Sequence, residues 1–111
     1  MARTDVAIQE PTRAGLTPTF TAATVDGQAF ANNGRTFLRF KNTGASTTVT
    51  IRFGGSKDGT AITGGRTITL PATTGDVTTA VWPPSDYNQA DGKVWIDYTL
   101  PAAVSVAVLA V

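Results

Sequence analysis

TFLRFKNTGASTTVTIRF, residues 36–53, is the stretch that decides the class of this fold. Its first six residues place Leu38 and Phe40 on one face and two cations on the other, and residues 48–53 repeat the alternation. A period of two puts apolar side chains on one side of a β-strand. Because the turn-forming residues 42–45 join the two runs, we expect a β-hairpin here.

The same alternation recurs along the chain, at residues 67–70, 77–81, 94–98 and 104–109, with weaker candidates at 19–24 and 28–30. Turns that contain glycine, asparagine or aspartate separate these runs. No window of a dozen residues shows a sustained helical stripe. Seven or eight short strands at this spacing predict an all-β fold, an antiparallel β-sandwich or a jelly-roll-like barrel, in one domain over residues 20–111.

Residues 1–19, MARTDVAIQEPTRAGLTPT, fit neither a strand nor a helix cleanly. Since Pro11 and Pro18 fix φ and lack a backbone donor, the segment favours an extended conformation. A free tail is one interpretation. We expect instead an extended N-terminal arm that docks on a neighbouring subunit or a partner, and whose residues 2–15 can be deleted without unfolding the domain. The candidate contacts on this arm are Arg3, Val6, Ile8, Arg13 and Leu16.

The charge of the chain excludes some classes of partner. Nine basic and eight acidic residues give a formal net charge of +1, so we expect no binding to nucleic acid or to an acidic membrane. The six arginines are scattered, which is typical of solvated surface, and docking onto an acidic protein surface is the alternative. The N-terminus lacks a continuous apolar segment and residues 101–111 are too short to span a bilayer, so we expect neither a secretory signal nor a membrane anchor.

Catalytic groups are scarce, since the chain has no histidine and no cysteine. This removes the usual proton shuttle, the thiolate nucleophile and most transition-metal sites. Asp86, Asp91 and Asp97 would need a cleft to act as glycosidase carboxylates, and so small a domain seldom makes one. Residues 86–92 are similar to a calcium-binding loop, but the register fails at Ala90. We expect no enzymatic activity, no metal and no cofactor.

The aromatic residues leave two interpretations open. In residues 82–87, WPPSDY, two prolines stiffen a loop that carries Trp82 and Tyr87. The loop is either an aromatic platform for a sugar or a neighbouring subunit, or a corner in which Trp82 closes one end of the core. Trp95 lies on the strand face opposite Val94, so it is either covered by the arm or a loop, or exposed at a subunit interface.

A family resemblance rests on six runs: PTRAGLTP (11–18), AATVDGQAF (22–30), NNGRTFL (32–38), KN (41–42), PPSDYN (83–88) and GKV (92–94). In these runs and their order the chain resembles the small β-rich head decoration, or cement, proteins of tailed bacteriophages. The resemblance implies a sandwich or jelly-roll-like fold, and trimers or other oligomers on the outer capsid surface. It also implies bridging of adjacent major capsid subunits, arms that reach neighbouring molecules, and assembly in the host cytoplasm.

The leading hypothesis is therefore a non-enzymatic virion structural protein that decorates and stabilises a phage capsid as an oligomer. The alternative from another class is a carbohydrate-binding or adhesion module that uses Trp82, Tyr87 and Trp95. Another virion part, such as a tail or head–tail joining protein, is a further alternative that the sequence does not separate from decoration.

Overall fold

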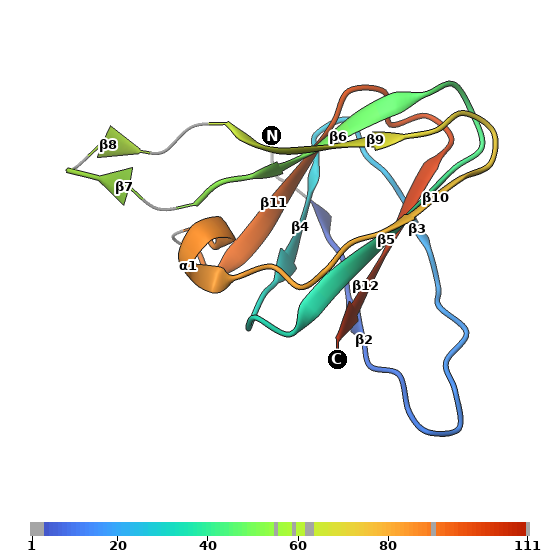
Figure 1. Ribbon diagram of the computed structural model, residues 1–111, viewed down its shortest axis with the longest axis horizontal. Coiled ribbons are helices and arrows are strands. Elements are labelled where there is room, and N and C mark those ends of the chain that lie inside the picture. The colour runs from blue at the N-terminus through green and yellow to red at the C-terminus, as the bar shows by residue number, and fades with distance from the viewer. Residues whose placement is uncertain (1–3, 55, 59, 62–63, 90, 111) are drawn as a thin grey trace.

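The computed structural model describes residues 4–54, 56–58, 60–61, 64–89 and 91–110. These residues form twelve strands and one short helix, where seven or eight strands were expected, and seven of the twelve have four or more residues. The strands make up two five-stranded sheets and a two-stranded hairpin (Figure 1). The prediction of an all-β fold is confirmed.

The first sheet has the strand order β1 (Thr4–Asp5), β4 (Gln28–Ala31), β11 (Lys93–Tyr98), β6 (Thr47–Arg52) and β9 (Gly65–Leu70). The second sheet has the order β10 (Gly75–Thr78), β5 (Thr36–Asn42), β12 (Val104–Ala110) and β2 (Ile8–Gln9), and β3 (Thr21–Ala22) also pairs with β12. Both sheets are mixed, because β1 runs parallel to β4 and β2 runs parallel to β12. A hairpin projects from the body, and one helical turn lies beside it: β7 (Ser56–Lys57), β8 (Thr60–Ala61) and α1 (Pro84–Tyr87) (Figure 1).

One apolar core joins the two sheets. Every second side chain of β5 and β6 contributes to it, with full burial at Leu38, Phe40, Val49 and Ile51. The alternation in residues 36–53 therefore identifies the inward faces of both strands correctly. The remaining members of the core cluster are Val6, Phe30, Leu70, Trp82, Val94, Ile96, Val104, Val106 and Val108. Burial of this apolar surface is the main stabilising contribution to the fold.

Residues 42–45 do not form the expected hairpin, because β5 lies in the second sheet and β6 lies in the first. The chain crosses between the sheets at Asn42, whose side chain is buried. Its Nδ2 donates to the carbonyl oxygens of Ala45 at 2.8 Å and Pro71 at 3.1 Å, and its Oδ1 accepts from the N–H of Gly44 at 3.0 Å. Both strands turn their apolar faces toward the same core, but they do so from opposite sheets. Periodicity alone does not decide whether two such strands pair in one sheet or face each other across the core.

The described beginning of the N-terminal segment belongs to the folded body. Residues 4–9 pass from the first sheet to the second, since β1 pairs with β4 and β2 pairs with β12. Between these strands Val6 is 6% exposed, and its N–H donates to the carbonyl oxygen of Ala29 at 2.9 Å. This corrects the expectation that Val6 contacts a partner, because its side chain is already covered. Deleting residues 2–15 would remove β1, β2 and Val6, so that deletion is not expected to leave the fold intact.

Val6→Ala is expected to lower the free energy of unfolding by about 1.5–2.5 kcal/mol, because two buried methyl groups lose their contacts. Val25→Ala is the matched control, since Val25 is 79% exposed and the same substitution there should change stability by less than about 0.5 kcal/mol. Urea unfolding of both variants measures the difference. Equal losses would show that Val6 is not a core residue.

Tyr98 of β11 connects the two sheets. Its ring meets that of Phe40 of β5 edge-on, with the ring centres 6.4 Å apart. Its hydroxyl donates to Oε1 of the fully buried Gln28, whose Nε2 donates to the carbonyl oxygen of Ala22 at 2.9 Å. Burial raises the pKa of the Tyr98 phenol well above its ordinary value, because the phenolate would lose its hydration.

Above about pH 10 the unfolded chain loses the Tyr98 proton while the folded protein keeps it, so unfolding becomes easier as the pH rises. This contribution is fully present below about pH 10 and is lost as the pH increases toward the folded-state pKa. In Tyr98→Phe the free energy of unfolding should fall less steeply above about pH 10, by up to about 1.4 kcal/mol per pH unit. Urea unfolding at a series of pH values tests this, and parallel profiles for the two proteins would contradict it.

Candidate functional site

Three aromatic rings pack in a row beside helix α1 and form what we call the aromatic corner: Phe53, Tyr87 and Trp82. The ring centres of Trp82 and Tyr87 are 4.8 Å apart at an interplanar angle of 77°, and those of Phe53 and Tyr87 are 5.6 Å apart at 41°. Trp82 is only 5% exposed. Its burial agrees with the corner interpretation and removes Trp82 from the exposed contacts, whereas Tyr87 is half-buried.

A buried asparagine holds the backbone of the aromatic corner. Asn32 donates through Nδ2 to the carbonyl oxygen of Trp82 at 2.9 Å and to Oδ1 of Asn88 at 2.8 Å. Its Oδ1 accepts from the N–H of Gly34 at 3.0 Å and from Oγ1 of Thr36 at 2.6 Å. All four hydrogen-bonding positions of the amide are therefore used. The sequence indicated only a turn here.

The helix that carries Tyr87 is also held from the side of β6. The N–H of Gly54 donates to the carbonyl oxygen of Asp86 at 2.9 Å. A Cβ on Gly54 would lie 1.9 Å from the carbonyl oxygen of Asn88, so a side chain at this position would push the helix away. Glycine is required because two backbones approach each other closely.

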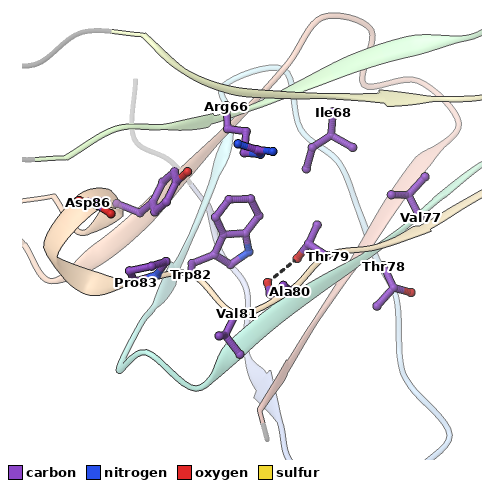
Figure 2. A pocket seen from close by; sticks show the side chains of 11 residues that line it. Arg66, Ile68, Val77, Thr78, Thr79, Ala80, Val81, Trp82, Pro83 and Asp86 are labelled. Carbon is purple, nitrogen blue, oxygen red and sulfur yellow. Dashed lines mark hydrogen bonds between the residues drawn. The ribbon is translucent and has the colours of Figure 1, made fainter.

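A groove of about 490 Å³ opens beside Trp82, between β9 at the end of the first sheet and β10 at the end of the second. Figure 2 shows Arg66 and Ile68 on one side of this groove, and Thr79 and Trp82 on the other. Its lining mixes apolar and polar groups. Concave surfaces of this kind are the usual places where proteins bind ligands.

One polar atom at this groove lacks a partner. The indole Nε1 of Trp82 is buried and has no hydrogen-bond acceptor in the part of the chain that the structure describes. It faces Thr79 and Ala80, where the carbonyl oxygen of Ala80 already accepts from Oγ1 of Thr79 at 3.0 Å (Figure 2). A buried donor without an acceptor costs about 1–3 kcal/mol of folding free energy.

Two opposite charges stand at the groove. Arg66 comes from β9 and Asp86 from α1, and neither side chain forms an ion pair within the described residues. The groove thus offers one cation, one carboxylate and apolar surface. These groups can orient a ligand that has a charge and an apolar part.

A second candidate element is the loop formed by residues 10–18, which stands away from the body (Figure 1). Gln9 clamps its base, because Nε2 donates to the carbonyl oxygen of Thr19 at 2.8 Å and Oε1 accepts from the N–H of Thr19 at 2.8 Å. Inside the loop the N–H of Gly15 donates to the carbonyl oxygen of Thr12 at 2.9 Å, and Gly15 has a φ of 98° that favours glycine. We call this segment the clamped loop.

The expected arm contacts fall into different environments. Arg13 and Leu16 are exposed on the clamped loop, with Leu16 39% exposed. Ile8 is 38% exposed on β2. Val6 lies in the core, and Arg3 lies outside the described residues. The predicted arm is therefore two parts, a pair of strands built into the sheets and the loop that follows them.

The structure does not bring the three candidate aromatic residues into one platform. Trp95 is half-buried on the outer face of β11, on the side opposite the buried Val94, and its Nε1 donates to Asp91 at 3.4 Å. Asp97, on the same face, forms an ion pair with Arg52 at 2.8 Å. No cluster of three potential metal ligands occurs among the described residues.

Comparisons with protein families, with curated proteins and with solved structures find no match to this chain. Within residues 4–110, apart from the undescribed positions, no helix is long and apolar enough to cross a membrane.

Trp82→Ala is expected to lower the free energy of unfolding by about 3–5 kcal/mol, because it leaves a cavity next to Tyr87 in the core. Val81→Ala is the control from the neighbouring position, where the side chain is 43% exposed and the loss should be well under half as large. Thermal and urea unfolding measure both variants. A Trp82→Ala protein that unfolds like the wild type would mean that Trp82 is not buried in solution.

Proposed function

We propose that this chain is a non-enzymatic structural protein of a virion. In this proposal it binds the outer surface of a phage capsid as an oligomer, with a trimer favoured, and bridges major capsid subunits. The observation that carries the proposal is the clamped loop, residues 10–18. An exposed loop with a fixed base is suited to docking, because less conformational freedom is lost when it binds.

The architecture supports this proposal at a general level. Two mixed sheets around one core are compatible with the proposed sandwich or jelly-roll-like arrangement, a rigid body on which a loop can be presented. The resemblance to head decoration proteins supplies the partner class, since the geometry alone would serve any assembly protein.

The proposed contacts on the capsid or on a neighbouring subunit are the exposed ones among those expected. Leu16 offers an apolar side chain, Arg13 offers a guanidinium that pairs well with carboxylates, and Ile8 is exposed on β2, next to the clamp residue Gln9. Arg3 remains a proposed contact from the sequence. Each contact is weak alone, but an oligomer that docks at several points gains affinity through effective concentration.

The carbohydrate-binding alternative is less well supported. Stacking against a sugar ring needs an exposed aromatic face, and Trp82 is buried against Tyr87. Trp95 lies on the outer face of β11, away from the aromatic corner. We therefore favour docking through the clamped loop.

The double variant Arg13→Glu, Leu16→Ser should keep the wild-type unfolding midpoint but bind capsids at least about tenfold more weakly, because both docking groups are lost from an exposed loop. Co-sedimentation with capsids assembled from the major capsid protein alone measures the binding, and light scattering measures the oligomer. Thr17→Ser, in the same loop, is the matched control. Undiminished binding by the double variant would rule out the loop as the docking element.

A further inference from the structure

We propose that the groove between β9 and β10 binds an extended segment of a partner protein, which adds as a strand to the edge formed by β10 and its continuation to Val81. The expected segment alternates apolar side chains and carries a carboxylate opposite Arg66. This site is distinct from the clamped loop, so it goes beyond the function proposed above.

The two sheets end at this groove with free edges. Among the described strands, β9 pairs only with β6, and β10 pairs only with β5. Beyond β10 the N–H of Thr79 still donates to the carbonyl oxygen of Leu38 at 2.8 Å, so this wall remains extended along β5. A strand edge that lacks a neighbour exposes backbone donors and acceptors, which an incoming extended chain can pair.

The opposite side of the body is closed by its own N-terminal strands. There β1 covers the edge of β4, and β2 and β3 cover the edge of β12. The fold therefore covers one pair of sheet edges with its own chain and leaves the other pair uncovered beside a groove. An accessible edge next to apolar side chains is what strand addition requires.

The lining of the groove fits the side chains of an added strand. Ile68 and Val77 are half-buried on its two sides, and Val81 is 43% exposed. An apolar side chain from every second position of an extended segment could cover them. The Trp82 ring lines the groove, and its buried Nε1 faces the wall at Thr79 and Ala80 (Figure 2), so the indole N–H reports on what binds against that wall.

Charge selects the segment further. The Arg66 guanidinium stands at the groove without an ion-pair partner in the described structure, so it favours a carboxylate at the ligand position opposite β9, while Asp86 on α1 favours no such group at the helix. The clamped loop of a second copy is a poor occupant, because Pro11 and Pro18 remove donors that an added strand needs. The favoured occupant is therefore a strand-forming segment of another protein that places one carboxylate opposite Arg66.

The chain has two tryptophans, so the indole N–H signals of Trp82 and Trp95 in a ¹⁵N-labelled protein provide a direct measurement. The probe is a capped heptapeptide in which valine alternates with threonine and with one central glutamate. As the peptide is added, the chemical shift of the Trp82 indole N–H should change until it reaches saturation. The chemical shift of the Trp95 indole N–H should not change. The same peptide with lysine in place of glutamate should bind roughly fivefold more weakly, and a peptide N-methylated at alternate residues should not bind.

Arg66→Gln should abolish the preference of the protein for the glutamate peptide over the lysine peptide. Thr67→Gln is the control, because it places the same amide on the other face of β9, and this variant should retain the preference. The proposal is overturned if the Trp82 signal does not move at millimolar peptide, or if the N-methylated peptide binds equally well. It is also overturned if the signal instead follows protein concentration together with a doubling of mass, since the groove would then belong to a second copy. Because no capsid is present in these measurements, they do not depend on the proposed docking of the clamped loop.

Discussion

The fold depends on how the chain satisfies its backbone polar groups where it passes from one sheet to the other beside the core. Two buried asparagines do this at the two ends of β5. Asn32 binds the carbonyl oxygen of Trp82 before the strand begins, and Asn42 binds those of Ala45 and Pro71 where it ends. Both amides are buried, and these bonds give their own polar atoms partners that water cannot supply there. These bonds fix where the crossing segments lie, and thereby the wall of the groove beside Trp82.

The two pairs of sheet edges differ. The N-terminal strands complete the sheets at β4 and β12, and the clamped loop leaves from that side. The groove lies at the other edges, between β9 and β10. If both proposed contacts form, the protein would touch two different neighbours at once, which is the geometry that bridging in an assembly needs. Loop docking and strand addition would then act together without competing for the same surface.

The sequence predicts the local features of this fold well and the long-range ones poorly. Alternation identified Leu38 and Phe40 as buried because a strand has only two faces. It could not say that β5 and β6 enter different sheets, since either arrangement buries the same side chains. The role of Asn32 was missed because two of its partners, Trp82 and Asn88, are 50 and 56 residues away. The burial of Val6 was missed, because the short apolar run from Val6 to Ile8 shows no period that distinguishes a core segment from an exposed arm.

The side-chain bridge between Gln9 and Thr19 has an evolutionary consequence. It closes the base of the loop without involving any residue from 10 to 18, so the sequence between can drift while the body folds as before. Lengthening such a segment is inexpensive, since doubling a flexible loop costs only about 0.6 kcal/mol of closure entropy. Insertions at this one position could therefore create new contact surfaces, and a foreign epitope grafted there should be displayed without redesign of the core.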